Sequence, residues 1–299
     1  MTRILLTGKT GQVGGELVTA LAPLGEVFAC DRSALDLADP AAIAATVRGI
    51  RPAIIVNAAA YTAVDRAESE PALAMAVNGA APGILAGEAR RLDAVLVHYS
   101  TDYVFDGTKR DPYDEDDPPN PLNVYGHTKL AGDRAVQASG AQHLILRTSW
   151  VYGATGRNFL VTILRLAAER DELKVVYDQV GAPTWCRDIA TATSAILTQV
   201  TTRTTAEFGN LQGIYNLSAQ GSASWHEFAT EILAHAPSAA AKPAARLTPI
   251  PTPEYPAAAA RPRNSMLRHD KLRRTFGIEL PHWLTSLKTC LAERRQSGD

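Results

Sequence analysis

The sequence predicts an α/β fold built on a doubly wound parallel sheet. Before Trp150, five short apolar segments alternate with stretches whose apolar residues have helical spacing. This alternation is typical of crossover units that place helices on both faces of a sheet. A glycine-rich loop separates the first strand from the first helix. The composition, with 46% apolar and 20% charged residues, is that of a globular protein.

The first half of the chain contains the regular part of this pattern. We expect strands at residues 4–7, 26–30, 53–57, 94–100 and 143–148. We expect helices at residues 12–24, 40–49, 71–91 and 125–138. In the first helix, Val13, Leu17 and Leu21 have helical spacing, and Pro40 suits the first turn of the second helix. Ligands of such a sheet bind at the carboxyl ends of its strands.

The second half is less regular and predicts a smaller α/β lobe that is interleaved with the first. Helical spacing occurs at residues 158–170, 188–198, 269–276 and 283–295, and strands are expected at 173–177 and 213–217. The segment 237–262 is rich in proline and alanine. We expect it to run irregularly over the surface.

Charge and cysteine content exclude several classes of protein. Lys and Arg (30) balance Asp and Glu (31), which leaves a net charge of −1 and no basic field to attract nucleic acid or anionic lipid. Cys30, Cys186 and Cys290 are far apart, which argues for a reducing compartment and against a disulfide framework or a zinc site. The sequence contains no signal-peptide pattern and no apolar stretch of about 18 residues. We therefore expect a cytoplasmic protein with no nucleic-acid or membrane partner.

The glycine-rich loop at residues 7–14, TGKTGQVG, predicts a Rossmann-type dinucleotide site. Gly8 permits a tight turn, Gly11 lets the backbone approach a pyrophosphate at the helix N-terminus, and Gly14 allows close packing of helix on sheet. No Gly-Lys-Ser/Thr closes the loop, so it is not a nucleotide-triphosphate loop. We expect an NAD(P)-binding domain at residues 1–152, completed by about 186–216. The substrate-binding lobe is then 153–185 and 217–299.

Two residues after the second strand point to different cofactors. Asp31 is placed to bond the ribose 2′-hydroxyl of NADH, whereas Arg32 is placed to bind the 2′-phosphate of NADPH. We favour NADPH and expect NADH to be accepted as well.

Tyr125 and Lys129 predict a carbonyl reductase. A spacing of four puts both side chains on one face of a helix. Reduction of a carbonyl leaves an alkoxide that needs a proton, and a nearby ammonium makes a tyrosine hydroxyl a stronger acid by lowering its pKa. A hydroxyl at the end of the fourth strand, from Thr101 or Ser100, is placed to bond the carbonyl oxygen.

These motifs, in this order, resemble the extended short-chain dehydrogenase/reductases and, within them, the dTDP-4-dehydrorhamnose reductase family. The similarity extends from Ile4 to about Glu293. It rests on the segments GKTGQVG, VNAAAYTAVDRAE, YSTDYVFDG, PLNVYGHTK, LRTSWVYG, GAPT and RPRNS.

The resemblance implies a set of site residues. The catalytic residues would be Thr101, Tyr125 and Lys129. The last two would also contact the cofactor, together with Gly8, Thr10, Gly11, Gln12, Val13, Asp31, Arg32, Asp36, Leu37, Ala58, Ala59, Ala60 and Thr62. The substrate contacts would be Val64, Asp65, Asn78, Asp102, Trp150 and Arg261.

The sequence departs from the family at a metal site. Some members bind Mg²⁺ at a dimer interface through three glutamates, and Glu16 and Glu293 match two of them. Arg187 stands near the third place. An arginine repels a divalent cation, and Mg²⁺ prefers carboxylate oxygens. We expect no metal here, Glu16 and Glu293 as plain surface residues, and either a monomer or a homodimer.

The resemblance implies NAD(P)H-dependent reduction of the C4 keto group of a nucleotide sugar, dTDP-4-dehydro-L-rhamnose, in the last step of dTDP-L-rhamnose synthesis for polysaccharides. One alternative is a reductase or epimerase of another nucleotide-linked deoxysugar. Another is a non-catalytic subunit similar to the beta subunit of methionine adenosyltransferase, against which Thr101, Tyr125 and Lys129 argue.

Overall fold

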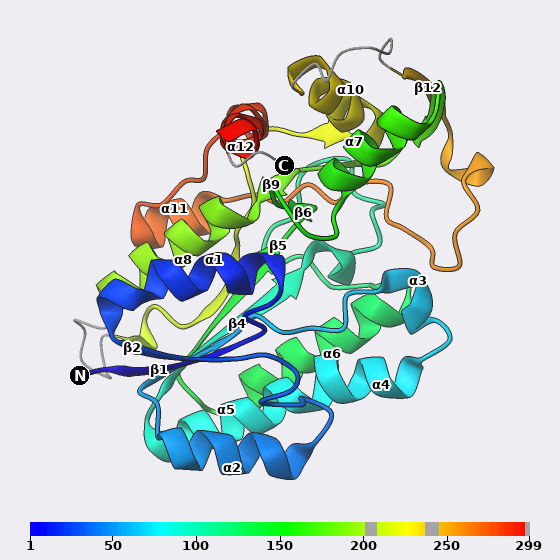
Figure 1. The fold of residues 1–299 in the computed structure, drawn as a ribbon. Helices are drawn as coiled ribbons and strands as arrows, with labels where there is room; N and C mark the ends of the chain where they lie inside the picture. The colour runs from blue at the N-terminus through cyan, green and yellow to red at the C-terminus, as the bar shows by residue number, and fades with distance from the viewer. Residues whose placement is uncertain (201–207, 237–244, 297–299) are drawn as a thin grey trace.

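The computed structural model describes residues 1–200, 208–236 and 245–296 (Figure 1). Its centre is a six-stranded sheet with the order β10-β5-β4-β3-β1-β2, in which every pairing is parallel. The strands are β1 (Arg3–Thr7), β2 (Glu26–Cys30), β3 (Ile54–Asn57), β4 (Val95–Thr101), β5 (His143–Thr148) and β10 (Gly213–Asn216). Each lies within one residue of its predicted range, because buried parallel strands are apolar runs bounded by turn residues.

Helices cover both faces of this sheet, as predicted (Figure 1). One face packs against α1 (Gln12–Leu21), α8 (Cys186–Val200) and α11 (Asp270–Phe276). The other face packs against α2 (Pro40–Ile50), α5 (Ala81–Leu92) and α6 (Val124–Ala138). Along β1, Ile4 and Leu6 enter the first core and Leu5 enters the second, as the alternation of side chains along a strand requires.

The chain reverses its direction of travel across the sheet at β1. It passes from β1 to β2 on one side and then returns to place β3 on the other side of β1. The carboxyl ends of β1 and β3 therefore border a switch point, which is where doubly wound folds bind their ligands.

The helix expected over residues 71–91 is confirmed, with a π-helical turn inside it. It consists of α4 (Pro71–Met75), a π-helical turn η2 (Ala76–Ala80) and α5. Pro82 lies in the first turn of α5, and proline lacks the N–H that would bond the carbonyl of Asn78 four residues earlier. The wider turn absorbs this break. It brings Asn78 so close to α6 that a Cβ at Gly132 would lie 2.2 Å from the Asn78 oxygen.

The second lobe has its own core beside the carboxyl end of the sheet. It contains α7 (Phe159–Glu169), α10 (Trp225–His235), α12 (Trp283–Gln296) and the parallel pair β7 (Glu172–Val176) and β12 (Arg246–Ile250). Two-residue strands complete it: β6 (Val151–Tyr152) with β9 (Thr184–Trp185), and β8 (Val180–Gly181) with β11 (Ala223–Ser224). The remaining short helices are η1 (Ala22–Leu24), α3 (Val64–Ala67), η3 (Asp102–Val104) and η4 (Thr252–Glu254).

Two features of this lobe differ from expectation. The segment 237–262 is not irregular throughout, because β12 pairs with β7; its residues 237–244 lie outside the described part of the chain. The helix α10 was not predicted, although its first turn has a capping box in which Ser224 and Glu227 each bond the other's backbone.

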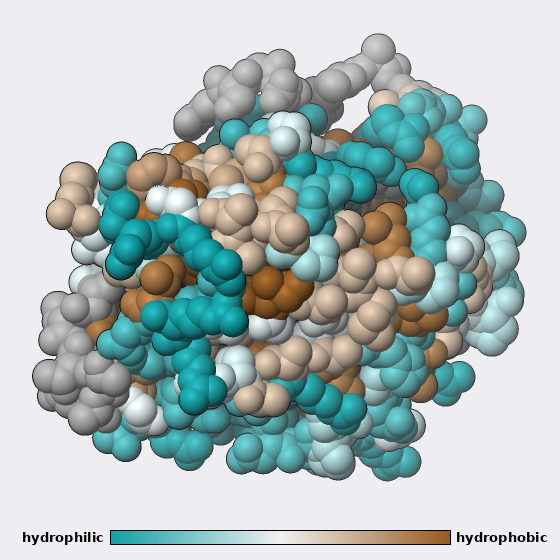
Figure 2. Space-filling view, turned by 90° about the horizontal axis from the view of Figure 1, so that it is seen from below, coloured by the Kyte–Doolittle hydropathy of each residue, from teal (hydrophilic) through white to brown (hydrophobic). Residues whose placement is uncertain are grey.

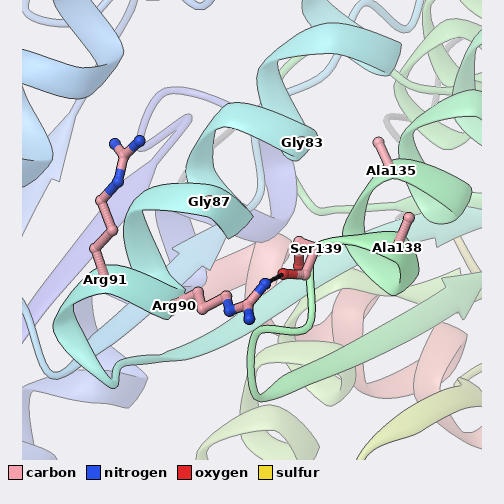
Figure 3. Close-up of a pocket in the computed structure, with 7 residues that line it drawn as sticks. All are labelled: Gly83, Gly87, Arg90, Arg91, Ala135, Ala138 and Ser139. Carbon is pink, nitrogen blue, oxygen red and sulfur yellow. Dashed lines mark hydrogen bonds between the residues drawn. The ribbon is translucent and has the colours of Figure 1, made fainter.

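The face formed by α2, α5 and α6 has hydrophilic side chains interspersed with less polar ones (Figure 2). A hollow of about 600 Å³ lies between α5 and α6, lined by Gly83, Gly87, Arg90, Arg91, Ala135, Ala138 and Ser139 (Figure 3). Arg90 donates to the Ser139 carbonyl across it (3.0 Å). Both helices lead into strands at this point, so the hollow is at the amino end of the sheet, away from the switch point. No helix in the described residues is long and apolar enough to cross a membrane.

Candidate active site

A cleft of about 1210 Å³ lies at the carboxyl ends of the strands, between the sheet and the second lobe. Every residue that the resemblance assigns to the cofactor lines it: Gly8, Thr10, Gly11, Gln12, Val13, Asp31, Arg32, Asp36, Leu37, Ala58, Ala59, Ala60, Thr62, Tyr125 and Lys129. Thr101, Val64, Asp102 and Trp150 also line it. The fold thus brings residues from six separate segments of the chain to one cleft.

The glycine loop forms a tight turn under the N-terminus of α1. Gly8 has φ +78° and its amide donates to the Cys30 carbonyl (2.9 Å). A Cβ at Gly14 would lie 2.0 Å from the Gly8 oxygen, so only glycine allows this packing. Gly11 is the N-cap of α1 and no side chain caps the helix. The first-turn amides and the positive end of the helix dipole therefore face the cleft, which fits a pyrophosphate.

Charged side chains gather where the ribose of a dinucleotide is expected. Asp31 accepts bonds from Ser33 and Ala34 and pairs with Lys9 (3.2 Å). The hydrogen bond from Ser33, with those from Ala34 and Lys9, lowers the pKa of Asp31 to about 2. The side chain of Arg32 is 75% exposed and lies 3.6 Å from Asp36. Two cations, Lys9 and Arg32, thus border this end of the cleft, and the sequence analysis did not single out Lys9.

The start of α6 positions Tyr125. The helix is capped by Asn123, whose side chain accepts the Gly126 amide (2.8 Å). A Cβ at Gly126 would lie 2.3 Å from the Tyr103 oxygen, so the first turn of α6 packs directly on η3. Thr101, which precedes η3, lies near the Tyr125 hydroxyl and acts to lower its pKa.

The two candidate hydroxyls at the end of β4 point to different partners. Ser100 donates to Asp133 (2.7 Å), whereas Thr101 donates to Asp102 (3.0 Å) and acts to lower the pKa of Tyr125. Asp102 is buried and also accepts from Ser149 (2.9 Å). Burial raises the pKa of Asp102 to about 6.

Lys129 lies one turn beyond Tyr125 and is buried behind it. Its ammonium donates to the Tyr99 carbonyl (2.5 Å) and lies 3.5 Å from His98 Nε2. Burial lowers the pKa of Lys129 to about 8, against the opposing effect of Asp133.

The net shift of the Tyr125 pKa is upward, not downward as expected. Burial dominates and raises the pKa of Tyr125 to about 12, although the bond from Thr101 opposes it. The hydroxyl therefore remains protonated at neutral pH. It is suited to releasing its proton only to a stronger base, such as an alkoxide.

An aromatic wall closes the cleft on the side of the second lobe. Trp150, with φ +45°, stacks on Trp225 with ring centroids 3.4 Å apart and planes 2° from parallel. Trp225 also contacts Phe159 (4.6 Å between centroids) and donates to Gln179 (3.2 Å). The sequence analysis missed Trp225, because no local motif marks it.

Three predicted substrate residues do not line the cleft. The amide of Asn78 bonds the backbone of Tyr61 and the hydroxyl of Thr128. Asp65 accepts two bonds from Arg261 (3.1 and 2.7 Å). Arg261 also hydrogen-bonds Tyr103, which is a lining residue, so this ion pair lies at the edge of the cleft.

The residues at the family's metal position do not fit Mg²⁺. Arg187 donates to Glu16 (3.0 Å) and to Glu293, so its guanidinium occupies the space between the two carboxylates. It also lies 4.8 Å over the ring of Trp185. Within the described residues, no group of three His, Cys, Asp or Glu side chains is arranged to hold a metal ion. Glu16 and Glu293 are therefore partners in an ion-pair cluster that joins α1, α8 and α12, not isolated surface residues.

Comparisons with known proteins agree with this geometry. The family model for the RmlD substrate binding domain matches residues 1–296. The dTDP-4-dehydrorhamnose reductase of Burkholderia thailandensis is 48% identical over 97% of this chain and 98% of its own length, and that of Escherichia coli K12 is 46% identical over 97% of each. The crystal structure of dTDP-4-dehydrorhamnose reductase from Bacillus anthracis in complex with NADP has a TM-score of 0.88 and 37% identity, covering 98% of this chain and 100% of that one.

Fold and cleft together define an oxidoreductase of the short-chain dehydrogenase/reductase class. Within that class, the chain belongs to the dTDP-4-dehydrorhamnose reductase family.

Proposed function

We propose that this protein reduces the C4 keto group of dTDP-4-dehydro-L-rhamnose to give dTDP-L-rhamnose, with NADPH as the preferred cofactor. The supporting observation is that Thr101, Tyr125 and Lys129 line the same cleft as the uncapped N-terminus of α1. Relatives at 46–48% identity over nearly the whole chain have this enzyme's name.

The chain's own residues would hold the dinucleotide at two points. The backbone of Gly11 to Val13 would bind the pyrophosphate, and Lys9 and Arg32 would bind a 2′-phosphate, because both cations border that end of the cleft. When bound, the nicotinamide supplies hydride to the carbonyl carbon.

Tyr125 would act as the general acid. Its hydroxyl gives its proton to the oxygen of the former carbonyl, while Thr101 bonds that oxygen or the phenol and keeps the two in register. Lys129, which lines the cleft one helical turn from Tyr125, would as an ammonium offset the negative charge that develops on the phenol.

The second lobe would hold the nucleotide sugar. Trp150 offers an apolar ring face for stacking, with Trp225 fixed behind it. The guanidinium of Arg261, at the cleft edge, is suited to the diphosphate of the substrate once it exchanges Asp65 for this ligand.

No Mg²⁺ is required in this proposal. The Arg187 guanidinium already pairs with both Glu16 and Glu293, so a divalent cation would have to displace it from two carboxylates.

The test is NADPH oxidation, followed by absorbance, with dTDP-4-dehydro-L-rhamnose as substrate. Tyr125→Phe should reduce kcat at least about a hundredfold, as loss of a general acid does, while NADPH binding is retained. Tyr177→Phe, an exposed tyrosine outside the cleft, is the matched control and should turn over normally. Near-normal turnover of Tyr125→Phe would refute the assignment. An enzyme that retains its nicotinamide through purification would indicate an epimerase instead.

A further inference from the structure

A buried polar network lies behind Lys129, on the side away from the cleft. His98 and Arg147, from β4 and β5, and Lys129 and Asp133, from α6, are each at most 2% exposed. Four ionisable side chains are thus packed together without access to water. Burying charges costs free energy unless they are paired, so this arrangement calls for a function.

The hydrogen bonds determine the protonation of His98. The Thr7 hydroxyl donates to Asn57 Oδ1 (2.7 Å), which leaves the Asn57 amide nitrogen to donate to His98 Nδ1 (3.1 Å). Nδ1 is therefore an acceptor, and the proton of the neutral ring is on Nε2. Burial lowers the pKa of His98 well below its usual value, so the ring is neutral.

Nε2 of His98 faces both Lys129 and Asp133. It lies 3.5 Å from the Lys129 nitrogen and 3.7 Å from Asp133 Oδ1. Because the ring carries its proton there, Nε2 cannot accept a proton from the ammonium, and Asp133 Oδ1 lies beyond hydrogen-bond distance without a partner of its own.

Asp133 is placed between two cations. It follows Tyr125 and Lys129 at successive spacings of four, so all three share one face of α6. Its other oxygen accepts from Ser100 (2.7 Å) and lies 3.8 Å from Arg147 Nε. The carboxylate is the one anionic group among the four ionisable side chains of this network.

We propose that Asp133 is the buried counter-ion that keeps Lys129 charged, and that the Ser100 hydroxyl holds the carboxylate in position as a neutral donor. Asp133 is thus a positioning residue that acts on the proton donor through Lys129. This inference rests on the proposed function, because it assumes that turnover needs the ammonium of Lys129.

Burial raises the pKa of Asp133 and lowers that of Lys129, and the attraction between the opposite charges acts against both shifts. Arg147 also opposes the raising of the Asp133 pKa by burial. The other charged or titratable groups that face this network are Tyr125 on α6, Asp102 beside Tyr125, and Glu115 and Asp116 near Arg147.

The experiment is the pH profile of kcat/KM for the full-length enzyme with NADPH and dTDP-4-dehydro-L-rhamnose. Removal of an opposite charge within a few ångströms shifts a pKa by about 1–3 units. Asp133→Asn should therefore move the alkaline limb to lower pH by about one unit or more. Asp133→Glu, which keeps the negative charge, should leave the alkaline limb close to its wild-type pH.

Glu88→Gln is the matched control. Glu88 is a buried carboxylate paired with Arg48 (2.7 Å) and Arg91 on α5, outside the cleft. The same acid-to-amide change there should lower the melting temperature and leave the alkaline limb in place. If Asp133 had only a structural role, Asp133→Asn would likewise lower the melting temperature and leave the alkaline limb in place.

An unmoved limb in folded Asp133→Asn would overturn the inference and leave the proposed function intact, provided that Tyr125→Phe is inactive. If Asp133→Asn does not fold, the wild-type enzyme is labelled with ¹³C at aspartate carboxyl groups. The Asp133 resonance should be that of a carboxylate at pH 7, and a protonated Asp133 at that pH would exclude a counter-ion.

Discussion

The indole rings of Trp150 and Trp225 stack with centroids 3.4 Å apart and planes 2° from parallel. Trp150 has φ +45°, a left-handed conformation that is unfavourable for a bulky residue. A Cβ at Gly181 would lie 2.5 Å from the Trp150 ring. The backbone strain is thus offset by close contacts on both sides of the ring, which hold it at the cleft.

Loss of Trp225 should weaken substrate binding more than turnover. An aromatic pair contributes about 0.5–1.5 kcal/mol beyond its buried area, so Trp225→Ala should raise KM for the nucleotide sugar about two- to tenfold while kcat changes little. Trp225→Phe should retain most of the stacking. Steady-state kinetics with NADPH at saturation measure this effect. An unchanged KM in Trp225→Ala would contradict the role of the aromatic wall in binding the nucleotide sugar.

Arg32 should control the choice between NADPH and NADH. A hydrogen bond to a charged group contributes about 1.5–3 kcal/mol, so Arg32→Ala should raise KM for NADPH about tenfold or more without raising that for NADH. Arg165→Ala, an exposed arginine on α7 paired with Glu169, is the control. Equal effects of Arg32→Ala on both cofactors would show that the 2′-phosphate is bound elsewhere.

Neither EDTA nor added MgCl₂ should alter activity or melting temperature. Arg187→Glu should make the protein respond to Mg²⁺, because three carboxylates would then face one another. MgCl₂ should therefore raise the melting temperature of this variant. Arg187→Ala should lower the melting temperature below that of the wild type by about 2 °C, since a partly exposed ion pair contributes at most about 1 kcal/mol to stability. Thermal melts with and without MgCl₂ test this prediction. A melting temperature of the wild type that rises with MgCl₂ would contradict the ion-pair cluster.

Asp102 should make stability fall as pH rises. Burial raises its pKa from 3.8 to about 6, so the folded chain binds its proton more tightly than the unfolded chain does. The resulting stabilisation is complete below pH 3.8 and is lost as pH rises through 6. Two pKa units correspond to about 3 kcal/mol. Asp102→Asn should therefore gain stability relative to wild type by up to about that amount between pH 4 and pH 7.

Urea unfolding at several pH values measures this difference, with Asp106→Asn as a control of opposite sign. The Thr108 amide and other donors lower the pKa of Asp106 to about 2. Its stabilisation is present above pH 3.8 and is lost as pH falls through 2. Asp106→Asn should thus lose stability relative to wild type as pH rises. Parallel curves for Asp102→Asn and wild type would show that Asp102 does not titrate as described.

The sequence allowed the central sheet to be predicted to within one residue per strand, because the strands are short apolar runs that end at turn residues. β12 escaped prediction because it contains Pro249. Proline is tolerated in this strand since β12 pairs on one side only, with β7.

The site could be predicted where its residues are close in sequence. Tyr125, Lys129 and the glycine loop are local patterns, and the fold brings them to one cleft. Trp225 and the pairing of Arg187 with Glu16 depend on contacts between distant segments, which periodicity does not reveal. The direction of the Tyr125 pKa also could not be foreseen, since it depends on how deeply the hydroxyl is buried.

The π-helical turn at Ala76–Ala80 has a consequence for how this enzyme can vary. It presses the Asn78 carbonyl against α6 at Gly132, where even a methyl group would collide with it. Any larger residue at position 132 would push the whole helix outward, and the phenol of Tyr125 would move with it. Gly132, which does not line the cleft, therefore determines where the proton donor lies. We expect few substitutions to be tolerated at this position, even though glycine has no side chain.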